Sequence, residues 1–216
     1  MSSTPTTPHI ELSALGAGFS NEALGSQSVF RAVLQALSQP GDPVAVVHDA
    51  EVPATGHAAS AAVLLALLDS ECTLWLSPRL ASSQAGVWLR FHTGCVLVDT
   101  PEQARFAWVA AGDAMPALAR LQRGSDEYPD QSATCVIDVA VLATAEEDAG
   151  AWRLTGPGIR SAQHLHVAGL PEDFSAQWAE NHAAFPRGVD VVLATATHIA
   201  GLPRTTRIES PSTVEA

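Results

Sequence analysis

Residues 72–110 read CTLWLSPRLASSQAGVWLRFHTGCVLVDTPEQARFAWVA, and their pattern decides the fold class. Four apolar runs, CTLWL, VWLRFH, CVLVD and ARFAWVA, are separated by Ser, Pro, Gly and Asp residues that favour turns. In VWLRFH the residues at 87, 89 and 91 alternate with those at 88, 90 and 92, as in a strand with two different faces. We therefore expect four short strands in this stretch.

Helices are expected on the N-terminal side of these strands. The segment GSQSVFRAVLQALSQPGDP (25–43) predicts a helix that Ser26 or Ser28 caps and Pro40-Gly41 stops. The buried stripe of this helix is expected to consist of Phe30, Val33, Leu34 and Leu37. A short strand is expected at 44–48, and a helix at 57–69 is apolar nearly all round, which predicts burial on most sides.

Strands and helices continue to alternate after residue 110. A helix is expected at 113–122 with Asp113 as its cap, and another at 171–183 in which Phe174 and Trp178 lie one turn apart. Further strands are expected in ATCVIDVAVLA (133–143), AWRLT (151–155), HLHVA (164–168) and VDVVLATA (189–196), the last of them before the tail. The sequence therefore predicts an α/β fold in which helices flank a single mixed β-sheet.

The chain is expected to form one domain over 19–208, between a flexible N-terminal segment (1–18) and a C-terminal tail (209–216). No secretory signal is readable, and the longest apolar run, AASAAVLLALL (58–68), is shorter than the roughly 20 residues of a membrane span. The three cysteines lie far apart among apolar neighbours, so a disulfide framework is not expected. These observations predict a soluble, cytoplasmic protein.

Charge excludes several partners and chemistries. The formal net charge is −12, which disfavours nucleic acid and anionic membrane surfaces as partners. All 11 basic residues are arginine, and the chain has no lysine. A pyridoxal phosphate enzyme needs a lysine for its Schiff base, and a P-loop needs its lysine against the phosphates. We therefore expect no pyridoxal phosphate and no other cofactor.

The segment RLTGPGIR (153–160) contains a Gly-Pro-Gly turn formed by Gly156, Pro157 and Gly158. A phosphate-binding loop would present consecutive free N–H groups, often at the start of a helix. Proline removes one of these donors, and the residues that follow favour a strand. The spacing favours a structural turn and leaves a contact loop as the alternative.

Two other groups are weaker candidates for a site. His92 and Cys95 lie three residues apart, and His164 and His166 share one strand face, but nothing completes the three or four ligands of a zinc site. Ordinary structural histidines are favoured, and no metal site is expected. Asp69 and Glu71 could act as an acid–base pair or could simply form an acidic turn after a helix.

The segment FPRGVDVVLATATHIAGLPRTTRI (185–208) carries the strongest candidates. Arginine held in a fixed loop binds phosphate through two parallel hydrogen bonds. The residues that could contact an anion or a partner are Arg187, Asp190, Arg204, Thr205 and Arg207. An Arg–Asp structural pair is as well supported as an anion site, and both readings stay open.

Seven stretches, in this order, resemble the PhnH family of the bacterial carbon–phosphorus lyase system. They are SQSVFRAVLQALSQPG (26–41), LLALLDSEC (64–72), LRFHTG (89–94), GSDEYPDQSAT (124–134), LTGPGI (154–159), FPRGVDVVLA (185–194) and GLPRTT (201–206). Each is weak alone, but the ordered set is specific and spans nearly the whole chain.

The resemblance implies a subunit of the carbon–phosphorus lyase core complex, with the G, I and J subunits as partners and a homodimer when isolated. In that pathway a phosphonate displaces adenine from the ribose of ATP. The family looks like the large domain of pyridoxal phosphate-dependent transferases without carrying that cofactor. It supplies no catalytic residue that can be assigned here, but it favours a contact loop over a structural turn for Gly156, Pro157 and Gly158.

Two alternatives remain from other classes. The chain could be a stand-alone enzyme or phosphate-ester binder that uses Arg187, Arg204 and the glycine turn, or it could be a purely structural dimer. Activity of the isolated chain would separate the first from a subunit, and partner binding would separate the second.

Overall fold

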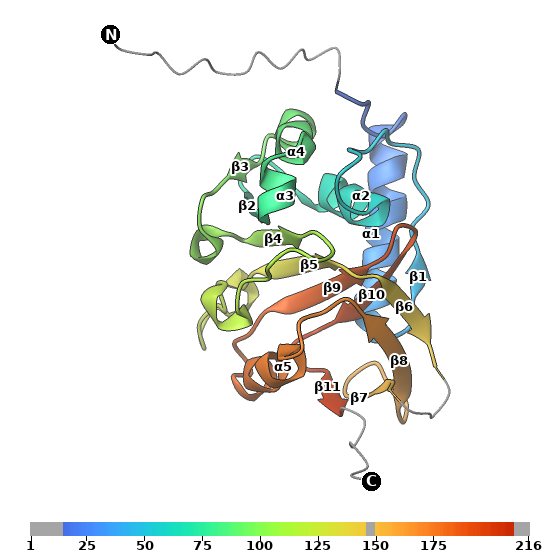
Figure 1. Ribbon diagram of the computed structural model, residues 1–216, viewed down its shortest axis with the longest axis vertical. Helices are drawn as coiled ribbons and strands as arrows, with labels where there is room; N and C mark the ends of the chain where they lie inside the picture. Colours follow the sequence, from blue (N-terminus) through green and yellow to red (C-terminus); the bar gives the residue numbers. More distant parts are fainter. Residues whose placement is uncertain (1–14, 146–149, 210–216) are drawn as a thin grey trace.

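A computed structural model describes residues 15–145 and 150–209 of the chain. Helices cluster in its N-terminal half, and one further helix lies near the C-terminus (Figure 1). Their bounds are α1 Glu22–Ser38, α2 Ala58–Leu67, α3 Pro78–Ala81, α4 Ala85–Thr93 and α5 Phe174–Ala183. Short 3-10 turns lie at Pro101–Gln103, Leu118–Arg120 and Pro129–Gln131.

A seven-stranded sheet has the order β1-β10-β9-β5-β4-β2-β3. The strands are β1 Val44–Ala45, β2 Thr73–Leu76, β3 Val96–Leu97, β4 Phe106–Val109, β5 Thr134–Asp138, β9 Asp190–Ala194 and β10 His198–Leu202. Neighbours from β3 to β9 pair in parallel, whereas β10 is antiparallel to both β9 and β1. The sheet is therefore mixed, as the sequence predicts.

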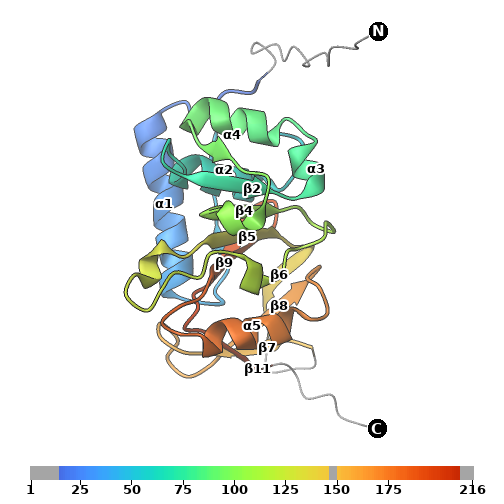
Figure 2. The ribbon, with the colours of Figure 1, turned by 90° about the vertical axis from the view of Figure 1, so that its left-hand side faces the viewer.

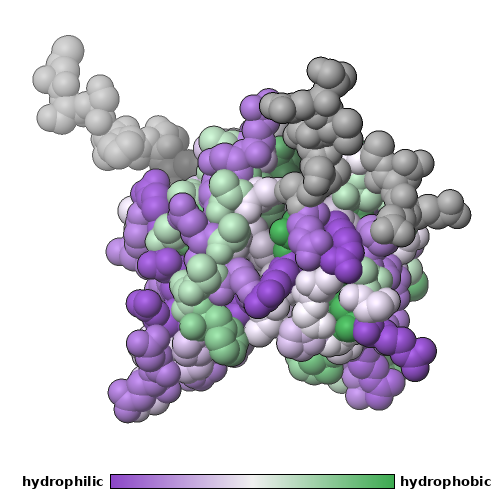
Figure 3. Space-filling view, turned by 90° about the horizontal axis from the view of Figure 1, so that it is seen from below, coloured by the Kyte–Doolittle hydropathy of each residue, from purple (hydrophilic) through white to green (hydrophobic). Residues whose placement is uncertain are grey.

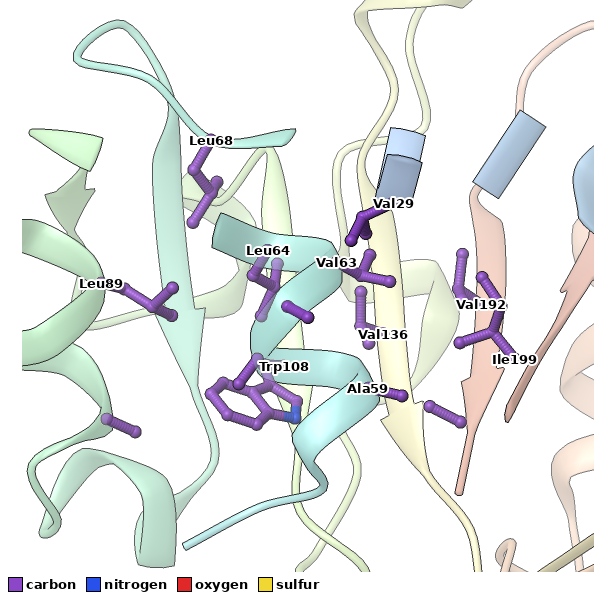
Figure 4. Packing of buried hydrophobic residues seen from close by; sticks show 14 of the residues in the cluster. Val29, Ala59, Val63, Leu64, Leu68, Leu89, Trp108, Val136, Val192 and Ile199 are labelled. Carbon is purple, nitrogen blue, oxygen red and sulfur yellow. The ribbon is translucent and has the colours of Figure 1, made fainter. Parts of the chain in front are cut away.

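Apolar residues cover both faces of this sheet because alternate side chains of each strand point to opposite sides. On one face Trp108, Val136 and Val192 join a cluster with α1, α2 and α4. Figure 4 shows part of this cluster, with Val63 and Leu64 of α2 at its centre. The intervening residues of the same strands pack on the other face, where α5 lies (Figure 2). The result is a layered core with two separate clusters.

A second, antiparallel sheet covers part of that other face. Its order is β11-β7-β8-β6, and its strands are β6 Val141–Thr144, β7 Trp152–Thr155, β8 Gln163–Ala168 and β11 Arg207–Glu209. Phe174 of α5 stacks between Trp152 of β7 and Trp178 of α5, at ring distances of 5.6 and 6.2 Å. These rings join the small sheet to α5, and the predicted one-turn contact between Phe174 and Trp178 is confirmed.

Helix α1 differs in start and orientation from the prediction. It begins four residues before Ser26, because the Asn21 side chain accepts a hydrogen bond from the Leu24 amide (3.1 Å) and caps the helix. Its buried residues are Val29, Val33 and Ala36, whereas Phe30 and Leu34 are about half exposed. The helix lies close to β10, since a Cβ at Gly201 would come within 2.6 Å of the Ala36 carbonyl oxygen.

Four further predictions about local structure are wrong. ATCVIDVAVLA (133–143) is not one strand, because it contains β5 and the start of β6, which belong to different sheets. VWLRFH (87–92) belongs to helix α4 rather than to a strand, because six residues can fit either periodicity and Trp88 and Leu89 are buried as neighbours on a helix. The predicted helix at 113–122 is reduced to the 3-10 turn Leu118–Arg120, and Pro116 lies in the middle of the missing segment. VDVVLATA is followed by β10 and β11 and is not the last strand.

The α/β class and the mixed sheet are confirmed, while the expectation of one sheet is corrected to two. The division of the chain into the segments 1–18, 19–208 and 209–216 stays a prediction, and most of both end segments lies outside the described residues. The likeness to pyridoxal phosphate-dependent transferases also stays a prediction. Within 15–145 and 150–209, no helix is long and apolar enough to cross a membrane.

Candidate functional site

The largest candidate site is an open hollow of about 610 Å³ between the end of β7, the end of α5 and the start of β11. We call it the Phe185 hollow; its walls include Gly156, Pro157, His182, Phe185, Thr205 and Arg207. These elements lie at the lower end of the molecule in Figure 1. Figure 3 looks onto that end and shows hydrophobic residues interspersed with hydrophilic ones. Four predicted site residues, Gly156, Pro157, Thr205 and Arg207, therefore meet here.

His182 and Arg207 supply polar groups to this hollow. The His182 Nδ1 lies 2.9 Å from the Arg204 carbonyl oxygen, which can only accept, so Nδ1 carries the proton. Nε2 then accepts a hydrogen bond from Arg207 Nε at 3.2 Å. His182 is not among the predicted site residues, and it lies near the end of the predicted helix at 171–183. The signal in the sequence that could have indicated His182 is that it lies just before Phe185 and Pro186, where the strongest candidate segment begins.

Arg204 and Asp190 form an ion pair whose side chains are only 12% and 27% exposed. Arg204 donates from Nε to Asp190 Oδ1 (3.1 Å) and from Nη2 to Asp190 Oδ2 (2.6 Å). Its other bonds go to the Pro129 and Pro186 carbonyl oxygens through Nη1 and to the Ser132 hydroxyl through Nη2. Every guanidinium nitrogen is engaged within the chain, so these contacts favour the structural pair over an anion site.

Arg187 has different surroundings from Arg204. It pairs with Asp126 at 3.2 Å, and both side chains are exposed, by 45% and 78%. An exposed pair of this kind is screened by solvent and contributes little to stability. The two arginines that the sequence groups together therefore differ in burial and in their carboxylate partner.

Gly158 faces its own chain rather than the hollow. Its φ of +84° lies in the left-handed region, and a Cβ there would come within 2.2 Å of the Ser38 carbonyl oxygen at the end of α1. Both facts explain the need for glycine without any external partner. The Gly-Pro-Gly turn thus has two sides, since Gly156 and Pro157 line the hollow and Gly158 packs against α1.

The weaker candidates, Asp69 and His92, line a second hollow of about 360 Å³ together with Glu22 and Ser26. His92 Nε2 donates to the Gly16 carbonyl oxygen (3.0 Å), which leaves Nδ1 as the unprotonated nitrogen of the neutral ring. Hydrogen bonds from the Cys72 thiol and the Glu71 amide lower the pKa of Asp69. The structure brings these two candidates together, although the sequence separates them, while Glu71 is exposed outside this hollow.

Asp138 is a buried carboxylate that the sequence analysis did not single out. It ends β5 and accepts hydrogen bonds from the His57 amide (2.8 Å), the Ser60 hydroxyl (2.5 Å) and Trp108 Nε1 (3.0 Å). Burial raises its pKa, although these hydrogen bonds oppose the shift. Because two of its donors lie at the start of α2, Asp138 ties that helix to the sheet. The signal in the sequence that could have indicated Asp138 is its place at the end of an apolar run rich in β-branched residues.

Asp113 also has a role other than the predicted helix cap. It accepts hydrogen bonds from the Ser77 hydroxyl (2.6 Å), the Arg79 amide (2.9 Å) and Arg79 Nε (2.5 Å). Burial raises the pKa of this carboxyl, but the bonds from Ser77 and Arg79 outweigh it and lower the pKa. The cluster links the segments that follow β2 and β4.

The described residues contain no group of three or more His, Cys, Asp or Glu side chains arranged to hold a metal ion. Cys72, Cys95 and Cys135 are free thiols. Burial raises the pKa of Cys135 to about 12, so this thiol stays protonated near neutral pH. The chain therefore offers isolated polar clusters rather than one catalytic constellation in the part that the structure describes.

Comparison with known proteins assigns most of the chain to one family. Residues 17–209 match the family model described as "Bacterial phosphonate metabolism protein (PhnH)". A Rhizobium meliloti (strain 1021) protein named "Alpha-D-ribose 1-methylphosphonate 5-triphosphate synthase subunit PhnH" is 39% identical over 191 residues, which are 88% of this chain and 94% of that protein. A Stutzerimonas stutzeri protein named "Putative C-P lyase subunit protein HtxG" is 35% identical over 187 residues, 87% of each chain.

Proposed function

Because the chain belongs to the PhnH family of bacterial phosphonate metabolism proteins, we propose that it is a subunit of a carbon–phosphorus lyase assembly. The observation that carries the proposal is the 39% identity to a protein named as a synthase subunit, over 94% of that protein. The second relative carries the same kind of name, a C-P lyase subunit. Two independent names of subunits favour a role within an assembly.

We propose that this subunit contributes to forming the product in the synthase's name. That product is a ribose with a methylphosphonate on carbon 1 and a triphosphate on carbon 5. ATP supplies the ribose and its triphosphate. A phosphonate oxygen forms the new bond to carbon 1, the bond from that carbon to adenine breaks, and adenine leaves with a proton.

The described residues favour a supporting subunit over a stand-alone enzyme. ATP and a phosphonate are both anions, and a chain with a net charge of −12 does not attract them at a distance. Arg204, the best buried cation, already uses all its donors within the chain. The proposed partners are the G, I and J subunits, with a homodimer when the chain is isolated. The proposed fold relationship is to pyridoxal phosphate-dependent transferases, without the cofactor.

The test is reconstitution with the other subunits. The chain is expressed alone and together with them, and adenine release from ATP is measured with and without methylphosphonate. We expect phosphonate-dependent adenine release from the assembly and none from this chain alone, and we expect omission of this chain to abolish it. Robust adenine release by the isolated chain would favour the stand-alone enzyme. An unchanged rate when the chain is omitted would contradict the proposal.

A further inference from the structure

We propose that the Phe185 hollow is the surface through which this chain binds another subunit of the assembly. Its occupant is an acidic segment of that subunit, which inserts one aromatic or aliphatic side chain beside Phe185 and places a carboxylate against Arg207. The inference rests on the proposed function, because it needs an assembly in which this chain has partners.

The shape and lining of the hollow fit an anchoring side chain. Interface residues that dominate binding free energy are enriched in aromatic residues and arginine and lie in pockets near the centre of the interface. Phe185 is 60% exposed, although it lines a concavity of about 610 Å³. A large aromatic side chain left in water loses the stabilisation that burial would give it. A partner's apolar side chain in the hollow would cover this ring.

The charge of the hollow determines the chemistry of the partner. Arg207 is exposed and donates to His182 through Nε, while no carboxylate among the described residues lies within ion-pair distance of it. Its two terminal nitrogens are thus available for a carboxylate, which arginine binds through two parallel hydrogen bonds. On a chain of net charge −12, a free cation beside an apolar hollow selects an acidic segment.

The walls of the hollow are held in place by the chain itself. β11 pairs with β7, so that Arg207 lies opposite Thr155. Trp178 Nε1 donates to the Thr206 carbonyl oxygen (2.8 Å), and a Cβ at Gly156 would come within 2.9 Å of the Thr205 carbonyl oxygen. A surface that is ordered before binding loses less conformational entropy on association.

Helix α1 provides an internal control for this proposal. Phe30 and Leu34 of α1 are 45% and 50% exposed, and Arg31 is exposed between them. This face has the same residue types as the hollow, yet neither Phe30 nor Leu34 lines any of the described hollows. The same substitutions can therefore be made at both places.

The experiment measures capture of this chain by the co-expressed carbon–phosphorus lyase subunits. Phe185→Ala and Arg207→Glu are compared with Phe30→Ala and Arg31→Glu, and thermal melts confirm that all four variants fold. We expect the dissociation constant of the assembly to rise at least about tenfold for each hollow variant and to change less than about twofold for the α1 variants. The dissociation constant for Arg207→Gln should lie between those of wild type and Arg207→Glu. This variant should also make capture less dependent on salt.

Several results would overturn the inference. Equal capture of wild type and both hollow variants would do so and leave the proposed function intact, whereas failure to capture the wild type would remove both. Normal assembly of the hollow variants with loss of adenine release would identify a small-molecule site instead. Dissociation of an isolated homodimer by Phe185→Ala, with capture unchanged, would identify a contact between two copies of this chain.

Discussion

Arg204 lies between β10 and β11, and Arg207, three residues later, is the first residue of β11, but their surroundings differ completely. Arg204 is 12% exposed and bonds to Asp190, to Ser132 and to two backbone carbonyl oxygens. Arg207 is exposed and bonds to His182 through Nε alone. The first guanidinium is fixed inside the chain, whereas the second faces the Phe185 hollow.

The difference between the two shows that residue type does not decide whether an arginine is structural or available for binding. The carboxylate of Asp190, the first residue of the neighbouring strand β9, neutralises Arg204. Residues 129–132 supply further hydrogen-bond acceptors. No such acceptor reaches the Arg207 terminal nitrogens in the part of the chain that the structure describes. The contrast predicts large stability effects at fixed groups and small ones at free groups.

The largest effect is expected for Arg204→Ala. The change leaves Asp190 largely buried without its cation, which costs about 3 kcal/mol of unfolding free energy, as for other broken buried pairs. Urea denaturation measures the loss. Arg207→Ala is the matched control and should change the unfolding free energy by less than about 0.5 kcal/mol. Equal, small losses of unfolding free energy for both variants would show that the contacts of Arg204 do not stabilise the fold more than those of Arg207.

A smaller loss is expected for Gly158→Ala, which tests the contact between the Gly-Pro-Gly turn and the end of α1. A side chain in the left-handed region costs about 1 kcal/mol, and the contact with the Ser38 carbonyl oxygen should bring the total to about 2 kcal/mol. Gly112→Ala is the matched control, since its φ of +80° is similar and its nearest neighbour, an Arg79 nitrogen, lies at 3.5 Å. Thermal melts of both variants isolate the contribution of the contact. Identical losses of stability for Gly158→Ala and Gly112→Ala would mean that α1 shifts to make room for the new side chain at no cost.

The Asp113 cluster provides an intermediate case, because its carboxylate is buried but its arginine is exposed. The folded-state pKa of Asp113 is lowered below 3.8, the ordinary value for aspartate, so the ionised form contributes stability above pH 3.8. We expect Asp113→Asn to cost about 1 kcal/mol at pH 6. The difference from wild type should disappear as the pH falls below 3.8 through the folded-state pKa. A difference that persists at low pH would show that packing, not charge, stabilises the cluster.

The smallest effect is expected for Arg187→Ala. Its pair with Asp126 is exposed on both sides, so the free energy of unfolding should change by less than about 0.5 kcal/mol. Chemical denaturation in low and high salt checks the result, and the effect should shrink further in high salt. A loss of unfolding free energy comparable to that of Arg204→Ala would contradict the distinction between the exposed pair of Arg187 and the largely buried pair of Arg204.

The long, strongly patterned elements could be predicted from the sequence. The apolar segment at 57–69 forms the buried helix α2, and VDVVLATA contains β9, which lies between β10 and β5 in the sheet. Short segments failed where two periodicities fit equally well, as in α4, or where a distant partner decides the conformation. β11 has only three residues and exists because Arg207 and its neighbours pair with β7.

The candidate site was predictable only as a set of parts. The glycine turn, Thr205 and the arginines are visible in the sequence, but their roles depend on which acceptors the fold brings near them. Ser132 and the Pro129 carbonyl oxygen come from a loop far from Arg204 along the chain, and no local pattern indicates that they meet. Phe185 precedes the predicted strand at 189–196, and only the structure shows that it is exposed at a hollow.

The position of β10 has a consequence for how the chain folds. β10 lies between β9 and β1, so Val44 and Ala45, near the beginning of the chain, pair only with Ile199 and His198, near its end. Pairings between such distant positions raise the contact order, which slows folding. During translation α1 leaves the ribosome long before Gly201, the residue against which its backbone packs. The helix can pack on α2 soon after both are made, but the side of α1 that meets β10 stays uncovered until almost the whole chain has been made.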